Sequence, residues 1–274
     1  MLALVEPVPD LANQAEVIRT PCGDGHMVWR SFGRGPVLVL LHGGTGSWRH
    51  WARNIADLSK TRRLLVADHP GLGDSDIPHD PISPDSIGRI EADGITQIIG
   101  NAPYDICGFS FGAMIAGHVA DIHGARVRTL TIVGPAALGI PRHSIQLEKI
   151  RSKEGAERRA ANRENLARFM FHNAANIDET AIDIQDLNTR QARLKSKGFA
   201  HTASLRDAAG RATAKVTALW GAVDVTAYPS IDERIAALRT ARADAGLVVI
   251  PDAGHWVAYE AAQAFNAALE DIIQ

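Results

Sequence analysis

The hydrophobic residues of the chain are concentrated in short continuous runs, which are separated by segments of helical spacing. Runs of this kind are typical of strands that are buried on both faces of a sheet. They are PVLVLLHGG (36–44), RRLLVAD (62–68), YDICGF (104–109), VRTLTIVG (127–134), KVTALWG (215–221) and AGLVVIPDAG (245–254). Two shorter strands are predicted near 15–20 and 26–32, on either side of the turn PCGDG.

Helices are predicted between these strands. Ser83 followed by Pro84 forms a favourable N-cap and first helical position for a helix that ends near Ile99. The other helices are predicted at 48–59, 111–124 and 230–239, with a final helix that ends at 273. Alternating buried strands and helices imply right-handed crossovers and a mostly parallel sheet, so the fold class is α/β.

The alternation is interrupted between residues 138 and 214, where the pattern is only helical. Residues 1–137 and 215–274 are therefore interpreted as one core domain, and residues 138–214 as an inserted helical cap. An insertion between two strands would cover the carboxyl edge of the sheet, where open α/β sheets bind their ligands. We expect a covered binding site.

Composition and charge exclude several classes of protein. The chain has 274 residues, of which 46% are hydrophobic and 22% charged, and its formal net charge is −2. This charge favours neither a nucleic acid nor an anionic membrane as a partner. Two cysteines without a disulfide pattern, and an N-terminus without signal-peptide features, favour a cytoplasmic protein. The sequence leaves a homodimer open.

Gly108–Gly112 reads G-F-S-F-G at the point where a strand turns into a helix. This arrangement matches the G-x-S-x-G nucleophile elbow, in which a strained turn presents the serine hydroxyl. Small residues on both sides allow the strand and the helix to approach each other. The sequence therefore predicts Ser110 as a nucleophile at the N-terminus of a helix, where the dipole favours negative charge.

A serine hydroxyl needs a base, and the base needs an acid that orients it. In the elbow fold these residues follow in the order serine, acid, histidine. Asp224 comes just after the strand at 215–221, and His255 just after the strand at 247–251. We therefore predict Asp224 as the acid and His255 as the base, while Asp252 is assigned to a turn. The competing histidines are His42, His50, His69 and His118, of which His42 is interpreted as structural.

An oxyanion hole is expected beside the serine, where each N–H donor contributes about 3–4 kcal/mol to catalysis. The backbone N–H of Phe111 is one expected donor, and the loop LLHGGTGSW supplies the other, Gly44. Glycine allows the backbone to approach a substrate closely. The loop lacks the Lys-Ser/Thr pair of a P-loop, which argues against nucleotide binding.

With these motifs, nearly the whole chain resembles the α/β-hydrolase superfamily. The matching motifs are His42-Gly43-Gly44, DHPGLGDS (68–75), Gly108–Gly112, Gly221–Asp224 and Gly254-His255-Trp256. The resemblance implies a mostly parallel eight-stranded sheet that is flanked by helices and carries a helical cap. It does not identify a substrate, because the superfamily contains many kinds of hydrolase.

The residue type of the nucleophile restricts which hydrolases of the superfamily this chain resembles. Dehalogenases and epoxide hydrolases of this superfamily use an aspartate at the elbow, whereas this chain has Ser110. Hydrolases of meta-cleavage products, which break a C–C bond in 2-hydroxy-6-oxo-dienoates, have a serine, a cap and a tryptophan after the histidine, as in His255-Trp256. By this resemblance, Arg190 in the stretch NTRQARLKSKGF would bind the substrate carboxylate, with Arg193 as its rival. That family usually has asparagine where this chain has Phe109.

The favoured interpretation is therefore a serine hydrolase that needs no cofactor or metal and cleaves a small carboxylic ester or related acyl substrate. The C–C hydrolase is the alternative, and a ligand receptor without turnover is a third. The residues expected to line the substrate site are Gly43, Phe109, Trp256, Arg190 and Trp48.

Overall fold

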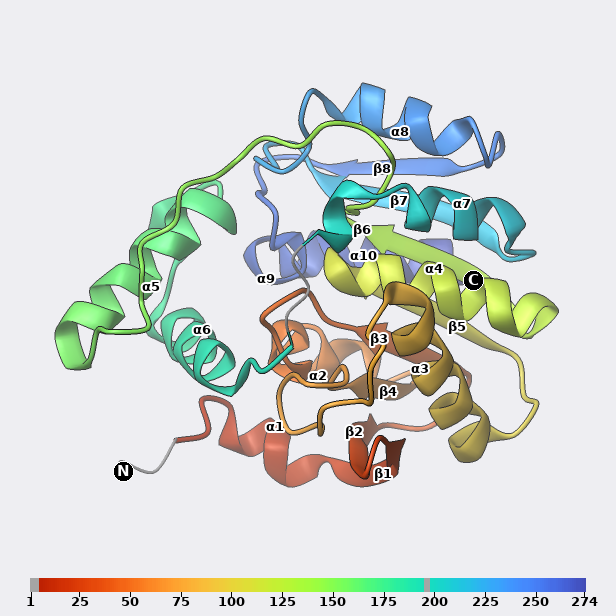
Figure 1. The fold of residues 1–274 in the computed structure, drawn as a ribbon, viewed down its shortest axis with the longest axis horizontal. Coiled ribbons are helices and arrows are strands. Elements are labelled where there is room, and N and C mark those ends of the chain that lie inside the picture. The colour runs from red at the N-terminus through yellow and green to blue at the C-terminus, as the bar shows by residue number, and fades with distance from the viewer. Residues whose placement is uncertain (1–4, 195–197) are drawn as a thin grey trace.

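The computed structural model describes residues 5–194 and 198–274. Its centre is an eight-stranded sheet in the order β1-β2-β4-β3-β5-β6-β7-β8, with helices on both faces (Figure 1). The strands are β1 (Glu16–Cys22), β2 (Gly25–Phe32), β3 (Val37–Leu41), β4 (Arg63–Ala67), β5 (Tyr104–Phe109), β6 (Val127–Val133), β7 (Lys215–Gly221) and β8 (Gly246–Ile250). The structure confirms the predicted α/β class.

The six strands from β3 to β8 run parallel, and the first two strands form an antiparallel edge. The parallel strands are almost entirely buried, which explains their continuous apolar sequences. Successive residues of one strand face opposite layers. In β3, Val39 and Leu41 belong to one hydrophobic cluster, whereas Leu38 and Leu40 belong to the other.

Two layers of helices cover the sheet. One layer contains α3 (Pro84–Ile99), α4 (Phe111–His123), α7 (Ser204–Arg211) and α8 (Ile231–Arg239). The other contains α2 (Ile55–Leu58), α9 (Val257–Glu260) and α10 (Ala262–Ile272). Single 3-10 turns are η1 (Trp48–Trp51), η2 (Gly124–Arg126), η3 (Ala174–Asn176) and η4 (Phe199–His201). Within the described ranges, no helix has both the length and the apolar sequence needed to cross a membrane.

The insertion between β6 and β7 contains α5 (Gly155–Phe169) and α6 (Glu179–Gln191), which lie beside the sheet in Figure 1. They pack through Arg158 of α5, whose side chain is 5% exposed and pairs with Asp186 of α6. The third helix of the insertion, α7, packs elsewhere. Leu205 of α7 fills the space beside Gly117 of α4, so α7 is part of the core layer. The segment predicted as a cap, residues 138–214, therefore includes one helix that packs in the core layer.

The structure differs locally from the sequence predictions in two places. The helix predicted at 48–59 is divided into η1 and α2, and between them the side-chain amide of Asn54 donates to Ala258 O and Asn266 Oδ1, which fixes this turn against α9 and α10. An additional helix, α1 (Pro9–Gln14), precedes the first strand. The segment before α1 is held by Glu6, which pairs with the buried guanidinium of Arg49.

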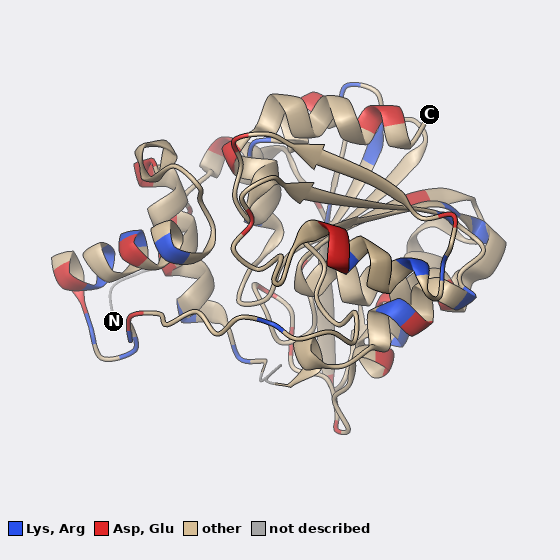
Figure 2. Cartoon of the chain, turned by 90° about the horizontal axis from the view of Figure 1, so that it is seen from above, with Lys and Arg blue, Asp and Glu red and all other residues tan. Residues whose placement is uncertain are grey.

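Acidic and basic residues are interspersed along the outer helices and do not gather by sign (Figure 2). On α5, for example, Arg159 pairs with Asp183 and Glu179, and Arg163 also pairs with Glu179. Such mixed surfaces have no extended field of one sign. The charge distribution therefore gives no direct indication of a highly charged macromolecular partner.

Candidate functional site

Ser110 lies in a strained turn between β5 and α4. Its backbone has φ 53° and ψ −107°, a conformation that residues other than glycine rarely adopt. The turn is held by the Ser110 N–H, which donates to Val133 O of β6 at 2.7 Å. On either side, a Cβ on Gly108 would lie 2.2 Å from Gly112 O, and one on Gly112 would lie 2.3 Å from Leu41 O. Both glycines are therefore required for the turn.

The structure brings His255 and Asp224 to this serine. His255 Nε2 lies 3.0 Å from Ser110 Oγ, and His255 Nδ1 lies 2.8 Å from Asp224 Oδ2. The residues follow the carboxyl ends of β8, β7 and β5, which meet at one edge of the parallel sheet. Gly134 of the loop after β6 completes the packing, because a Cβ there would be 2.9 Å from His255 Cε1.

The electrostatics of the pair favour an ionised aspartate. Burial of Asp224 acts to raise its pKa, but the adjacent His255 and the N–H of Thr226, which donates at 2.8 Å, lower it below the usual value overall. An ionised Asp224 fixes the proton of His255 on Nδ1, which leaves Nε2 free to accept a proton from Ser110. This is the arrangement that nucleophilic catalysis by serine requires.

Ser110 opens into a cavity of about 230 Å³. Its wall is mainly apolar and includes Phe111, Met114, Phe169 and Met170. Gly43, Gly44 and Phe109, which the sequence analysis placed at the site, also line it. This volume is below the usual range of ligand pockets, about 300–1,000 Å³, so the cavity fits only a small substrate.

At this cavity, the backbone N–H groups of Gly44 and Phe111 have no acceptor among the described residues. Phe111 is the first residue of α4, where a helical N–H has no partner within the helix. The Gly44 N–H makes no hydrogen bond to any part of the chain that the structure describes. In contrast, the neighbouring Gly43 N–H donates to His50 Nδ1 at 3.2 Å. The arrangement leaves Gly44 and Phe111 available to an oxyanion.

Two of the residues expected at the substrate site are not in the cavity wall. Trp48 is completely buried in the layer of α2, α9 and α10, and the guanidinium groups of Arg30 and Arg49 lie over its ring. Trp256 is 1% exposed, and its indole N–H donates to His50 O at 2.9 Å. Both act as packing residues, because helix η1 and the loop after His255 turn their rings into the core.

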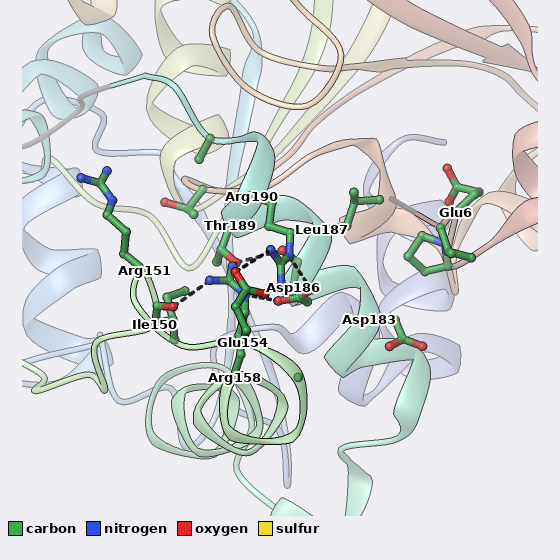
Figure 3. Close-up of a pocket in the computed structure, with 15 residues that line it drawn as sticks. Glu6, Ile150, Arg151, Glu154, Arg158, Asp183, Asp186, Leu187, Thr189 and Arg190 are labelled. Carbon is green, nitrogen blue, oxygen red and sulfur yellow. Dashed lines mark hydrogen bonds and ion pairs between the residues drawn. The ribbon is translucent and has the colours of Figure 1, made fainter. Parts of the chain in front are cut away.

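Arg190 lies in a second, larger cavity of about 1,420 Å³, between the N-terminal segment and the helices α5 and α6. Figure 3 shows its guanidinium bound to Asp186 and Glu154. The structure therefore does not bring Arg190 to Ser110, because the α6 residues pair with α5 and the loop before it. Thr45 lines both cavities, so they adjoin at that residue.

The rival arginine, Arg193, also lies elsewhere. One of its terminal nitrogens donates to Ser75 O and to Gly73 O, which is 3.3 Å away. Residues 195–197 of the same stretch, NTRQARLKSKGF, lie outside the described residues. Neither arginine suggested by sequence is a lining residue of the Ser110 cavity.

Sequence reasoning missed Arg142, which is the one charged side chain among the described residues that line the Ser110 cavity. Arg142 lies on the segment between β6 and α5, and no sequence motif surrounds it. Its approach to Ser110 depends on how this segment folds back over the sheet. Only the three-dimensional structure could identify it.

The loop that carries His255 is also bound directly to the segment after α5. The Trp256 N–H donates to Met170 O at 2.8 Å. The Glu260 carboxylate accepts from the N–H groups of Gly254, His172 and Asn173, at 2.8, 2.9 and 2.8 Å. A Cβ on Gly254 would lie 2.6 Å from His172 N. The loop that carries His255 and the segment after α5 are therefore joined by several backbone hydrogen bonds.

Three of the competing histidines, His42, His50 and His69, have structural partners, whereas His118 on α4 has a buried Nε2 without a partner among the described residues. His42 Nε2 accepts from the His69 N–H at 3.0 Å, and its Nδ1 lies 2.7 Å from Gly43 O. His69 in turn bonds Glu91. Burial lowers the pKa of His42 well below its usual value, and lowers that of His50 to about 3. These neutral rings support the loop beneath Gly44. Within residues 5–194 and 198–274, no three His, Cys, Asp or Glu side chains are grouped like metal ligands.

An eight-stranded sheet with a strained serine after its fifth strand, and a histidine and aspartate at the same edge, defines the class of the protein as an α/β hydrolase. Residues 38–268 match the Alpha/beta hydrolase family, and the chain belongs to it. The family and its named relatives also support hydrolase activity.

Three similar proteins illustrate the range of the family. The chain is 24% identical over 266 residues to a 2-hydroxy-6-oxononadienedioate/2-hydroxy-6-oxononatrienedioate hydrolase of Comamonas testosteroni, and the match covers 88% of each chain. It is 32% identical over 112 residues to a 2-hydroxymuconate semialdehyde hydrolase of Pseudomonas sp. (strain CF600), and the match covers only 40% of each chain. The solved structure of a carboxylesterase from Bacillus subtilis superposes with a TM-score of 0.77 at 16% identity, covering 97% of this chain and 94% of the other.

Proposed function

We propose that the protein is a serine hydrolase that cleaves a small carboxylic ester or related acyl substrate and needs no cofactor. The observation that carries this proposal is the continuous contact from Asp224 through His255 to Ser110, with the serine facing a small, mainly apolar cavity. The strained backbone of Ser110 supports it, because such strain is typical of functional sites.

In the proposed mechanism, His255 Nε2 removes the proton of Ser110 as Oγ attacks the substrate carbonyl. Asp224 stabilises the resulting imidazolium. The N–H groups of Gly44 and Phe111 donate to the oxyanion of the tetrahedral intermediate, and His255 then protonates the leaving alcohol. Water, activated by the same histidine, releases the acid from the acyl-enzyme. We also propose that α5 and α6 cover this site as a cap.

The first test is the hydrolysis of a short p-nitrophenyl ester by the wild-type protein and by Ser110→Ala. We expect kcat/KM to fall by at least about a thousandfold in the variant, since the nucleophile is lost. A fluorophosphonate probe should phosphonylate Ser110 in the wild type, with Oγ displacing fluoride and the mass rising by that of the probe less HF, and should do so more slowly in His255→Ala. Equal hydrolysis by the wild type and Ser110→Ala would reject the mechanism.

A second candidate is a C–C hydrolase of 2-hydroxy-6-oxo-dienoates. It is favoured by the match to the Comamonas protein, which covers 88% of both chains. Comparing kcat/KM for a short p-nitrophenyl ester and for a dienoate ring-cleavage product distinguishes the two. A much larger value for the dienoate would assign the C–C reaction, and a larger value for the ester would assign an esterase. Binding without turnover of either substrate would favour a receptor.

A further inference from the structure

The wall of the Ser110 cavity includes a positively charged side chain, that of Arg142, which no carboxylate of the described residues contacts directly. Arg142 is half-buried in its wall, and within the described part of the chain it makes no ion pair. The carboxylate that acts on it electrostatically is that of Asp224, which already accepts hydrogen bonds from His255 and Thr226. Burial outweighs this attraction and lowers the pKa of Arg142.

A second buried arginine increases the positive charge behind this wall. Arg234 of α8 is fully buried, and its Nη2 donates to Pro141 O at 3.0 Å and to Tyr228 O at 2.7 Å. Its Nε and Nη1 have no partner in the described ranges. Burial and the charge of Arg142 together lower the pKa of Arg234 to about 10.

This arrangement has two consequences for the site. By holding the carbonyl of Pro141, Arg234 fixes the residue that precedes Arg142, and so fixes where the Arg142 side chain begins. At the same time the two guanidinium groups leave an excess of positive charge at an otherwise apolar cavity. A buried cation of this kind is costly unless an anion pairs with it.

We infer that Arg142 binds a carboxylate carried by the substrate, on the part of the molecule away from the carbonyl that Ser110 attacks. This inference rests on the proposed function, because it assigns the substrate class of the same site. A guanidinium forms two parallel hydrogen bonds with a carboxylate, which gives orientation as well as affinity. Ser110 and Arg142 line one cavity of about 230 Å³, so only a short chain separates the two groups of the substrate.

The test uses two esters of equal chain length, the mono-p-nitrophenyl ester of adipic acid and p-nitrophenyl hexanoate, which differ in the terminal carboxylate. We expect the wild type to prefer the acidic ester by about tenfold or more in kcat/KM. Arg142→Met should reduce this preference by about tenfold, mainly through KM, and Arg142→Lys should recover part of it because it keeps the charge. Arg89→Met, which removes an exposed arginine from α3, is the charge-matched control and should keep the preference.

Binding provides a readout that does not depend on turnover. Monomethyl adipate is titrated into Ser110→Ala and into Ser110→Ala/Arg142→Met by calorimetry, and the double variant should bind it about tenfold more weakly. If neither ester is hydrolysed but this difference is present, the proposed function fails and the Arg142 site stands. If both esters are hydrolysed with a preference that Arg142→Met and Arg142→Lys leave unchanged, the Arg142 site is rejected and the hydrolase stands. Loss of the preference in Arg190→Met alone would also overturn the proposal, because the carboxylate would then be bound from the cap.

Discussion

Gly112 leaves no room for a side chain, since a Cβ there would lie 2.3 Å from the carbonyl oxygen of Leu41. We expect Gly112→Ala to lower the free energy of unfolding by more than about 2 kcal/mol, because the start of α4 must move away from β3. Urea denaturation followed by circular dichroism measures the effect.

Gly44→Ala is the matched control for this prediction. A Cβ on Gly44 would meet Phe111 Cβ at 3.5 Å, an ordinary contact distance. We expect its free energy of unfolding to stay within about 1 kcal/mol of the wild type. If both variants unfold at the same urea concentration as the wild type, the tight packing at the elbow does not determine stability.

Candidate residues were predictable where their chemistry restricts the backbone. Ser110 was identifiable because the strained turn requires glycines at fixed positions, and Asp224 and His255 because they directly follow apolar strands. Arg142 has no such local signal. Arg190 was assigned by resemblance to another family, but Asp186, one helical turn earlier in α6, already binds it.

At the scale of elements, the ion pair between α5 and α6 should stabilise the insertion more than its exposed pairs do. Arg158 is almost completely buried and contacts Asp186, Thr189 and Ile150 O, whereas Arg163 on the same helix makes a solvent-exposed pair. We expect Arg158→Ala to cost about 2–3 kcal/mol, because the contacts of its buried guanidinium with the half-buried Asp186, with Thr189 and with Ile150 O are lost. Arg163→Ala should cost less than about 1 kcal/mol.

Hydrogen exchange of the amides in α5 and α6 measures this difference locally. In Arg158→Ala the protection of both helices should decrease, while that of the central strands should be unchanged. Equal protection in Arg158→Ala and Arg163→Ala would show that apolar contacts, and not the buried pair, hold the two helices together.

The strands were predicted closely because each is an apolar run between polar turns, and β7 has the bounds that the sequence indicated, residues 215–221. Helices without their own signal were less predictable. The break between η1 and α2 lies at Asn54, whose side chain contacts α10 about two hundred residues away in sequence, a contact that no local pattern indicates. The assignment of α7 to the core depends in the same way on Gly117, whose missing side chain admits Leu205.

At the scale of the whole molecule, the buried neutral histidines make stability sensitive to acid. The folded-state pKa of His50 is lowered to about 3, and that of His42 is also lowered, whereas an unfolded histidine takes up a proton near pH 6.5. Below pH 6.5 the unfolded state therefore binds more protons than the folded state. As the pH decreases below 6.5, the free energy of unfolding should fall by about 1.4 kcal/mol per pH unit for each such histidine.

Urea titrations between pH 8 and pH 5 measure this dependence. Above pH 7.5 the two histidines should contribute no slope, because they are neutral in both states. His50→Gln should reduce the slope below pH 6.5 by about one histidine's share. A free energy of unfolding that stays constant from pH 7.5 to pH 5 would contradict the assignment of neutral, buried rings.

The hydrogen bonds between the His255 loop and residues 170–173 have a consequence for how the two segments evolve. Because Glu260 and the Trp256 N–H bind the segment after α5, we expect a substitution in that segment to shift the loop that carries His255. Changes that suit a new substrate are then selected together with compensating changes around Glu260. A chimera that exchanges insertions between two relatives should keep its turnover only if it transfers residues 170–173 together with their partner loop, 254–260.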